Sequence, residues 1–186
     1  MIDLFATLYR LAGSREKAAR LVESTAEEVG VPVDYGSRAL VAMALCRRGS
    51  RPEEVSASLG WTEFESFCSK LLVTSGYVVE ENVVLKKPRA QIDLVAFGPS
   101  LTLSVDCKHW KREHPPSTLK LIAAKQLRRS ELLRRRFPDA RPIASAILSF
   151  SASQGGFVNG VAVVPIRTLR SFLGSVESYS ELLRYA

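Results

Sequence analysis

The chain of 186 residues is long enough for one well-packed domain with a small appendage. Its composition, 46% hydrophobic and 24% charged, is ordinary for a globular protein and argues against collagen-like or wholly disordered chains. No apolar run approaches the roughly 20 residues that span a bilayer, no secretory signal opens the chain, and the three cysteines form no CxxC pair, so the sequence predicts a cytoplasmic protein without a membrane partner.

The net charge of +7 is concentrated in one segment. Residues 107–141 contain 11 basic and 3 acidic side chains, whereas the rest of the chain is nearly balanced. A clustered positive charge is typical of a protein with a polyanionic partner. The alternative interpretation is a solvated helix face that is rich in lysine and arginine.

The first part of the chain, residues 1–60, is predicted to be helical. Ser14 and Ser50 stand at positions typical of helix N-caps. Helices are expected over residues 13–30, 34–49 and 50–60. We interpret this region as a helical extension, which serves as a cap on the following domain, as a dimerisation element or as a helix-turn-helix-like DNA-binding unit.

A further helix is predicted over residues 61–77, with its apolar side chains on one face. Thr62 is followed three residues later by Glu65, which matches a capping box. In that motif the glutamate bonds back to the start of its own helix, which is a structural explanation for Glu65.

After Gly76 the pattern changes to one typical of strands. Segments rich in Val, Ile and Leu predict strands over residues 77–87, 91–97, 101–108, 142–150 and 158–165. A long helix is expected between the third and fourth strands, over 117–136, and short closing helices over 166–174 and 177–185. This order predicts a mixed α/β domain over residues 61–186, with helices available for both faces of the sheet.

The turn "GPS" between the second and third strands sets the pairing of two acidic residues. If Phe97 faces Thr102, Asp93 lies directly opposite Asp106, with their Cβ atoms about 5 Å apart on one face of the sheet. Lys108 shares this face, because alternate residues of a strand point the same way.

Two carboxylates this close raise each other's pKa unless a cation lies between them. Mg²⁺, or Mn²⁺ in its place, binds carboxylate oxygens together with water and substrate phosphate. We expect Asp93 and Asp106 to hold one such ion with the backbone carbonyl of Cys107, and Lys108 to orient the attacking water or stabilise negative charge. The alternative is a salt bridge at the end of a sheet.

The stretch "QIDLVAFGPSLTLSVDCKHW" resembles the core of the PD-(D/E)xK nuclease superfamily, especially the Mrr-like restriction endonucleases and the archaeal Holliday-junction-resolvase-like branch. Asp93 and the tripeptide from Asp106 to Lys108 match the family pattern, although Asp106 stands where glutamate is commoner. The resemblance covers about residues 61–173. It implies a restriction-endonuclease-like mixed β-sheet flanked by helices, with an N-terminal helical extension.

The same resemblance implies two further site residues. The family has an acidic residue on the helix before the first strand, where Glu65 stands here, and often a glutamine on the helix after the lysine, where Gln126 stands. The resemblance therefore implies that Glu65, or Glu63 in its place, takes part in the metal site and that Gln126 is a catalytic-site residue.

On a helical wheel, the apolar residues of 117–136 gather in one sector, which Leu132 and Arg134 do not follow. Gln126 lies inside that sector, so it needs a buried partner, either an active site or a neighbouring backbone carbonyl. The opposite sector is basic and free to contact phosphates. The predicted nucleic-acid contacts on this sector and in the loop "KKPR" are Lys86, Lys87, Arg89, Lys120, Lys125, Arg128, Arg129, Arg135 and Arg136.

These observations predict a Mg²⁺-dependent endonuclease that hydrolyses phosphodiester bonds in DNA and works as a homodimer, since two copies of one site cut two strands. One alternative is a nucleic-acid-binding protein of the same fold with little or no cleavage. Another is a protein-interaction module whose basic helix binds an acidic partner. RNA as the substrate, and the shape and sequence of the substrate, stay open.

Overall fold

The computed structural model describes residues 3–110, 114–150 and 155–186. By its internal contacts the chain divides into two compact units, Met1–Thr74 and Ser75–Ala186, and each is described by itself. This division follows the helix over residues 61–77 that the sequence assigns to the start of the α/β domain. In the described ranges, no helix combines the length and the apolarity that a membrane-spanning segment needs.

The N-terminal unit is a group of helices packed around a central one. Seven consecutive residues of that central helix, from Ala39 to Leu45, are buried, because the other four helices all contact it. Its many alanines let these neighbours approach closely. The helices are α1 (Leu4–Ala12), α2 (Arg15–Glu28), α3 (Arg38–Arg47), α4 (Pro52–Ser56) and α5 (Trp61–Thr74).

Of the two N-caps predicted at serines, one is confirmed. Ser14 Oγ accepts a hydrogen bond from the backbone N–H of Lys17 at 3.2 Å, so it caps α2. The cap predicted at Ser50 is wrong, because the N-cap position of α4 is Arg51 and no side chain caps it. Pro52 occupies the first turn, where its fixed φ suits a helix start without a cap.

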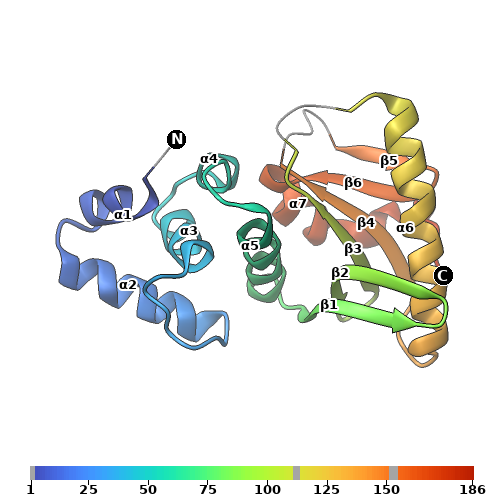
Figure 1. Ribbon diagram of the computed structural model, residues 1–186, viewed down its shortest axis with the longest axis horizontal. Helices are drawn as coiled ribbons and strands as arrows, with labels where there is room; N and C mark the ends of the chain where they lie inside the picture. The colour runs from blue at the N-terminus through green and yellow to red at the C-terminus, as the bar shows by residue number, and fades with distance from the viewer. Residues whose placement is uncertain (1–2, 111–113, 151–154) are drawn as a thin grey trace. The chain divides into compact units, whose positions relative to one another are not determined.

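The C-terminal unit is built on one mixed sheet with the strand order β1-β2-β3-β4-β6-β5 (Figure 1). The first three strands pair antiparallel, β3, β4 and β6 run parallel, and β5 returns antiparallel to β6. The mixed α/β class is thereby confirmed. The strands are β1 (Val78–Lys86), β2 (Arg89–Phe97), β3 (Thr102–Lys108), β4 (Ile143–Ser149), β5 (Gly156–Val158) and β6 (Val161–Pro165).

The strand predicted over 158–165 is in fact a hairpin. Val158 pairs with Val161 across a two-residue turn, in which Asn159 and Gly160 have φ values of 53° and 83°. Positive φ at both positions is the hallmark of the type I′ turn that Asn-Gly favours, because its twist matches that of the two strands. Asn-Gly is a turn signal in the sequence, but the apolar residues on both sides of it favoured the prediction of one continuous strand.

The end of the chain is less helical than expected. After a 3₁₀ turn, η1 (Ile166–Thr168), the predicted helix over 166–174 forms as the short helix α7 (Leu169–Gly174). The helix predicted over 177–185 is wrong, because only a 3₁₀ turn, η2 (Val176–Tyr179), is present. Farther on, Tyr185 bridges to Ala144 at a stretch of β4 that the shorter β6 leaves open.

The long helix α6 (Pro116–Arg136) joins β3 to the parallel strand β4 and packs against the sheet. Its buried residues are spaced by three or four positions, namely Ala123, Gln126, Ser130 and Leu133. Two of these are small, which brings the helix close enough for Ser130 Oγ to bond Ser145 Oγ of β4 at 2.6 Å.

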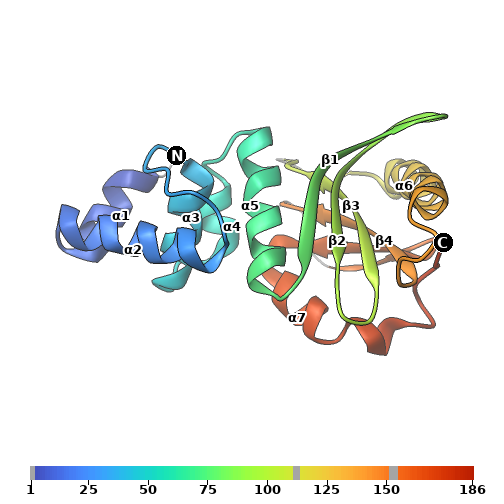
Figure 2. The same cartoon turned by 90° about the horizontal axis from the view of Figure 1, so that it is seen from below.

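The hairpin of β1 and β2 runs past the rest of the sheet, and its end lies beside α6 (Figures 1 and 2). Val83, Leu85 and Ile92 from the hairpin form a buried cluster with Leu133, and Leu132 packs against it. This contact explains why Leu132 departs from the wheel pattern, since a second surface covers α6 on that side.

Arg134 also departs from the wheel pattern, and it is a structural residue. Its guanidinium donates five hydrogen bonds to the backbone carbonyls of Pro138, Ala140, Arg141 and Ala186. These bonds join the end of α6 to the loop that follows it and to the C-terminal segment.

A carboxylate cluster beside a basic groove

The pairing of β2 with β3 brings the two motif acids together. Phe97 pairs with Thr102 and Leu94 pairs with Val105, so the predicted register is confirmed. The ladder ends there, and Asp93 and Asp106 are the next residues on the two strands. The backbone N–H of Cys107 donates instead to Asp93 Oδ2 at 2.8 Å, so a side chain replaces a strand carbonyl as the acceptor.

Asp106 is a buried carboxylate held by two cations. Its side chain is 2% exposed, Arg129 Nη1 donates to Oδ1 at 2.9 Å, and Lys108 Nζ lies 2.8 Å from Oδ2. Within the described residues, Oδ2 accepts no aligned hydrogen bond and is held by its ion pair with Lys108. Oδ2 is therefore a buried oxygen with lone pairs available to a further ligand.

The buried position of Asp93 disfavours its ionised form. Burial raises the pKa of Asp93 above its ordinary value, the Cys107 N–H opposes that rise, and the neighbouring Asp106 carboxylate adds to it. Lys108 and Arg129 also lower this pKa, by smaller amounts. An additional cation beside Asp93 would therefore be stabilised by its charge.

Gln126 connects α6 to β3. Its side-chain NH₂ donates to the carbonyl of Ser104 at 2.8 Å and to Ser104 Oγ at 3.0 Å, while its Oε1 accepts from Arg129 Nη1 at 3.3 Å. The buried partner that this polar residue needs thus includes a backbone carbonyl. Gln126 also orients the guanidinium that contacts Asp106, so it meets the cluster through Arg129.

The position of Arg129 differs from the sequence prediction. The helical wheel places Arg129 on the exposed basic face of α6, but its side chain is only 32% exposed and turns toward Asp106. Residues three apart share a helix face. The buried Gln126, three residues earlier, is therefore the signal that Arg129 also faces the sheet.

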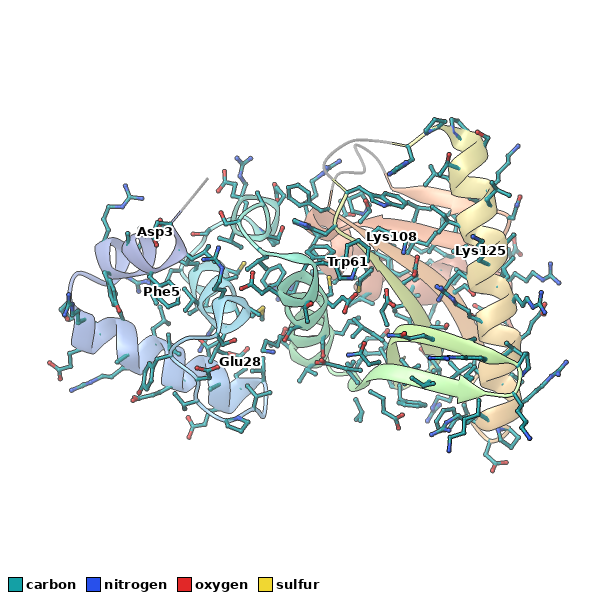
Figure 3. All side chains as sticks on the ribbon, viewed as in Figure 1. Asp3, Phe5, Glu28, Trp61, Lys108 and Lys125 are labelled. Atoms are coloured by element: carbon teal, nitrogen blue, oxygen red, sulfur yellow. The ribbon has the colours of Figure 1, made fainter. Side chains whose placement is uncertain are left out.

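A groove of about 420 Å³ lies between the end of the β1–β2 hairpin and α6. Its charged lining residues are all basic, namely Arg89, Lys125, Arg128 and Arg129. Val84 and Leu132 add apolar walls. Lys125 on α6 lines the groove, whereas Lys108 lies at the end of β3 (Figure 3). The groove joins the "KKPR" segment to the basic helix, which are separate surfaces in the sequence prediction.

The other predicted nucleic-acid contacts are exposed. Lys86 pairs with Arg89 across a two-residue turn, so "KKPR" is the tight end of a hairpin instead of an open loop. The exposed basic residues of this turn and of α6 are Lys86, Lys87, Arg89, Lys120, Lys125, Arg128, Arg135 and Arg136.

Glu65 lies in the N-terminal unit, where Trp61 Nε1 donates a hydrogen bond to its carboxylate. The capping box predicted for it is wrong, because α5 already begins at Trp61. Glu63 fills that role, since its Oε2 accepts from the backbone N–H of Gly60 at 2.6 Å. Participation of Glu65 in a metal site stays a prediction.

The donor set of Asp93 and Asp106 fits a hard divalent cation. Within the described ranges, no three His, Cys, Asp or Glu side chains form a group suited to a metal ion. Mg²⁺ is usually bound by one or two carboxylates, with waters and substrate phosphates as its other ligands. The buried Oδ2 of Asp106 and the neighbouring carboxylate of Asp93 meet this requirement. A role for the Cys107 carbonyl stays a prediction.

Comparisons of the chain with protein-family models, with curated proteins and with solved structures gave no significant match.

Proposed function

We propose that the C-terminal unit is a Mg²⁺-dependent endonuclease domain with a restriction-endonuclease-like fold, which hydrolyses phosphodiester bonds in DNA. The observation that carries this proposal is the convergence of Asp93, Asp106 and Lys108 next to a groove whose charged residues are all basic. The strand sequence supports the fold, since an antiparallel β1–β2–β3 meander is followed by α6 and the parallel strand β4.

In the proposed reaction, the carboxylates of Asp93 and Asp106 would hold the metal. When bound, Mg²⁺ would lower the pKa of the attacking water and supply positive charge beside the phosphate. Lys108 keeps its ammonium group 2.8 Å from Asp106 Oδ2, so it is positioned to donate to the negative charge that develops on the scissile phosphate. Its burial, at 18% side-chain exposure, strengthens that interaction.

The groove supplies the proposed binding surface for the nucleic-acid backbone. Arg89, Lys125 and Arg128 present cations to phosphates from two sides, while Val84 and Leu132 are available to the sugars. Phosphate contacts of this kind position the strand without reading its sequence. The proposal therefore implies binding with little dependence on base sequence in this groove.

The second candidate is a protein that binds nucleic acid through the same groove and does not cleave it. One observation favours it: Asp106 already has a cation on each oxygen. With Asp93 and Asp106 ionised, Lys108 and Arg129 balance the cluster without a metal.

A cleavage assay separates the two candidates. The full chain is incubated with duplex, junction, flap and single-stranded DNA and with matching RNA, in Mg²⁺, in Mn²⁺ or in EDTA. We expect metal-dependent cleavage that Asp93→Ala abolishes. Binding without cleavage of any of these substrates in either metal would establish the second candidate.

Lys108→Ala tests the role of the lysine in the same assay. We expect cleavage to slow by about 10²–10³-fold, because one preorganised donor to the transition state is removed. Nucleic-acid affinity should change little, since many other cations contact phosphates. Lys17→Ala, at an exposed position of α2 outside the predicted nucleic-acid contacts, is the control and should leave the rate unchanged. Equal losses of rate and affinity in Lys108→Ala would make this residue only a phosphate contact.

A further inference from the structure

Arg129 lies between the carboxylate cluster and the groove. Its Nη1 contacts Asp106 Oδ1 at 2.9 Å and Gln126 Oε1 at 3.3 Å, and the same side chain lines the groove. A guanidinium has five N–H donors, and both of these bonds use one nitrogen. In the described part of the chain, these two bonds leave Nε and Nη2 for a ligand in the groove.

The cation on Asp106 conflicts with a metal at the same carboxylate. A divalent ion bound to Oδ2 would place three cationic groups, the ion, Lys108 and Arg129, around one buried aspartate. The metal-free cluster is already balanced, with two acids and two bases. Repulsion between these cations lowers metal affinity for as long as Arg129 stays on Oδ1.

Of the two cations that contact Asp106, Arg129 is the one that can move away from it. Lys108 is 18% exposed and is held on the same strand as Asp106, two residues away. Arg129 is 32% exposed, reaches Asp106 from α6, and borders the groove on its other side. Moving its side chain from Asp106 to a phosphate would leave the backbone of the strands in place, because Arg129 belongs to α6.

We infer that Arg129 is an exchangeable counter-ion: it neutralises Asp106 in the metal-free protein and passes to a phosphate of the bound strand when a divalent cation occupies the cluster. This inference rests on the proposed function. Because one side chain links the two ligands, the metal raises the affinity for the polyanion, and the polyanion raises the affinity for the metal by the same factor. Arg129 is thus a positioning residue that couples the two binding events.

The opposite role gives the opposite result. If Arg129 were only a structural partner of a buried carboxylate, its removal would loosen Asp106, and Mg²⁺ affinity would fall or stay the same. If Arg129 is an exchangeable counter-ion, its removal takes away a competing charge and Mg²⁺ affinity rises. The direction of the change therefore decides between the two roles.

The experiment is calorimetric titration of Mg²⁺ into the full chain without nucleic acid. We expect Arg129→Gln to bind Mg²⁺ roughly tenfold more tightly than the unsubstituted protein, which corresponds to about 1.4 kcal/mol. Arg128→Gln is the matched control, because it removes the same charge from the same helix and groove at an exposed position. It should change the affinity by less than about twofold, since exposed charges at a distance are screened.

A second titration measures the coupling. The probe is a short single-stranded phosphorothioate oligonucleotide, which resists hydrolysis, titrated with and without Mg²⁺. In the unsubstituted protein Mg²⁺ should tighten its binding several-fold. In Arg129→Gln this enhancement should disappear, whereas Arg128→Gln should bind more weakly and keep it.

Each outcome bears on the inference. Thermal unfolding establishes whether the variants are folded. If Arg129→Gln is not folded, Arg129→Lys replaces it in the titration. We then expect a smaller rise in Mg²⁺ affinity, because the single ammonium of lysine binds Asp106 less firmly than the guanidinium does. Equal or weaker Mg²⁺ binding by the Arg129 variant overturns the counter-ion role and leaves the proposed endonuclease intact. An absence of Mg²⁺ binding in the unsubstituted protein and in every variant overturns both. Binding that appears only in the Arg129 variant supports the inference.

Discussion

At the scale of the residue, the burial of Asp93 opposes the ionisation of its carboxylate. Its carboxylate is half-buried next to a second carboxylate, and its pKa is raised chiefly by burial. Groups with such shifts in a cluster of charges are typical of functional sites. Ionisation of Asp93 therefore destabilises the fold, and a bound cation would relieve this effect.

Asp93→Asn tests this interpretation and keeps an oxygen acceptor for the Cys107 N–H. A raised folded-state pKa means that the stabilising contribution of Asp93 is fully present below its unfolded-state pKa and is lost as the pH rises through the folded-state value. At pH 7 in EDTA the variant should therefore unfold at a higher temperature than the unsubstituted protein. The difference should shrink as the pH falls through the acidic range.

Scanning calorimetry over a pH series measures both effects. Added Mg²⁺ should narrow or reverse the difference in unfolding temperature, because metal binding stabilises only the protein that has the Asp93 carboxylate. A variant that is less stable than the unsubstituted protein in EDTA at pH 7 would contradict the interpretation of Asp93.

At the scale of the element, α6 combines three functions along one helix. Its small buried residues pack on the sheet, Gln126 and Arg129 reach toward β3, and its exposed face is basic. Its last turn contains Arg134, which bonds the carbonyls of the following loop and of Ala186. Neighbouring arginines of this helix therefore have different roles.

Arg134→Met should destabilise the fold by about 3 kcal/mol, because hydrogen bonds to a charged group contribute about 1.5–3 kcal/mol each and are not additive. Urea denaturation measures the change. Arg135→Met, next to it and exposed, should stay within about 0.5 kcal/mol of the unsubstituted protein. Equal effects of the two substitutions would mean that the carbonyl contacts of Arg134 contribute nothing specific.

The basic groove yields a second prediction for α6. The double variant Lys125→Gln with Arg128→Gln should bind DNA more weakly, whatever its sequence. The dependence of log K on log salt should flatten by about 0.9 for each duplex phosphate that the variant no longer neutralises. Arg135→Gln with Arg136→Gln removes the same charge from exposed positions outside the groove lining and is the control. A control that flattens the salt dependence more than the groove variant would move the binding surface toward the end of α6.

At the scale of the whole molecule, we expect the protein to act as a homodimer. If the carboxylate cluster cleaves DNA as proposed, one cluster would cut one strand at a time. Two copies related by a two-fold axis would match the two strands of a duplex or junction. Light scattering at the protein concentration of the cleavage assay measures the mass. A monomeric mass together with full cleavage of both strands would refute this expectation.

Most of the carboxylate site could be predicted from the sequence, because it depends on local rules. A short turn set the register of β2 and β3, and the strand period of two placed Lys108 with Asp106. A local rule also predicts the hairpin turn at Asn159–Gly160, because Asn-Gly favours a two-residue turn. The sequence prediction missed this turn, because the apolar residues on both sides of the dipeptide favoured one continuous strand.

The sequence by itself therefore determined the mixed α/β class, the pairing that brings Asp93 to Asp106, and the basic character of α6. Only the tertiary structure decided that Arg129 turns to Asp106 and that the β1–β2 hairpin reaches α6 to form the groove. It also decided that Arg134 donates hydrogen bonds to the backbone oxygen of Ala186. A helical wheel describes one helix around its own axis. Which of its sectors is covered, and by what, depends on segments far away in the chain, whose positions are set by packing over the whole unit.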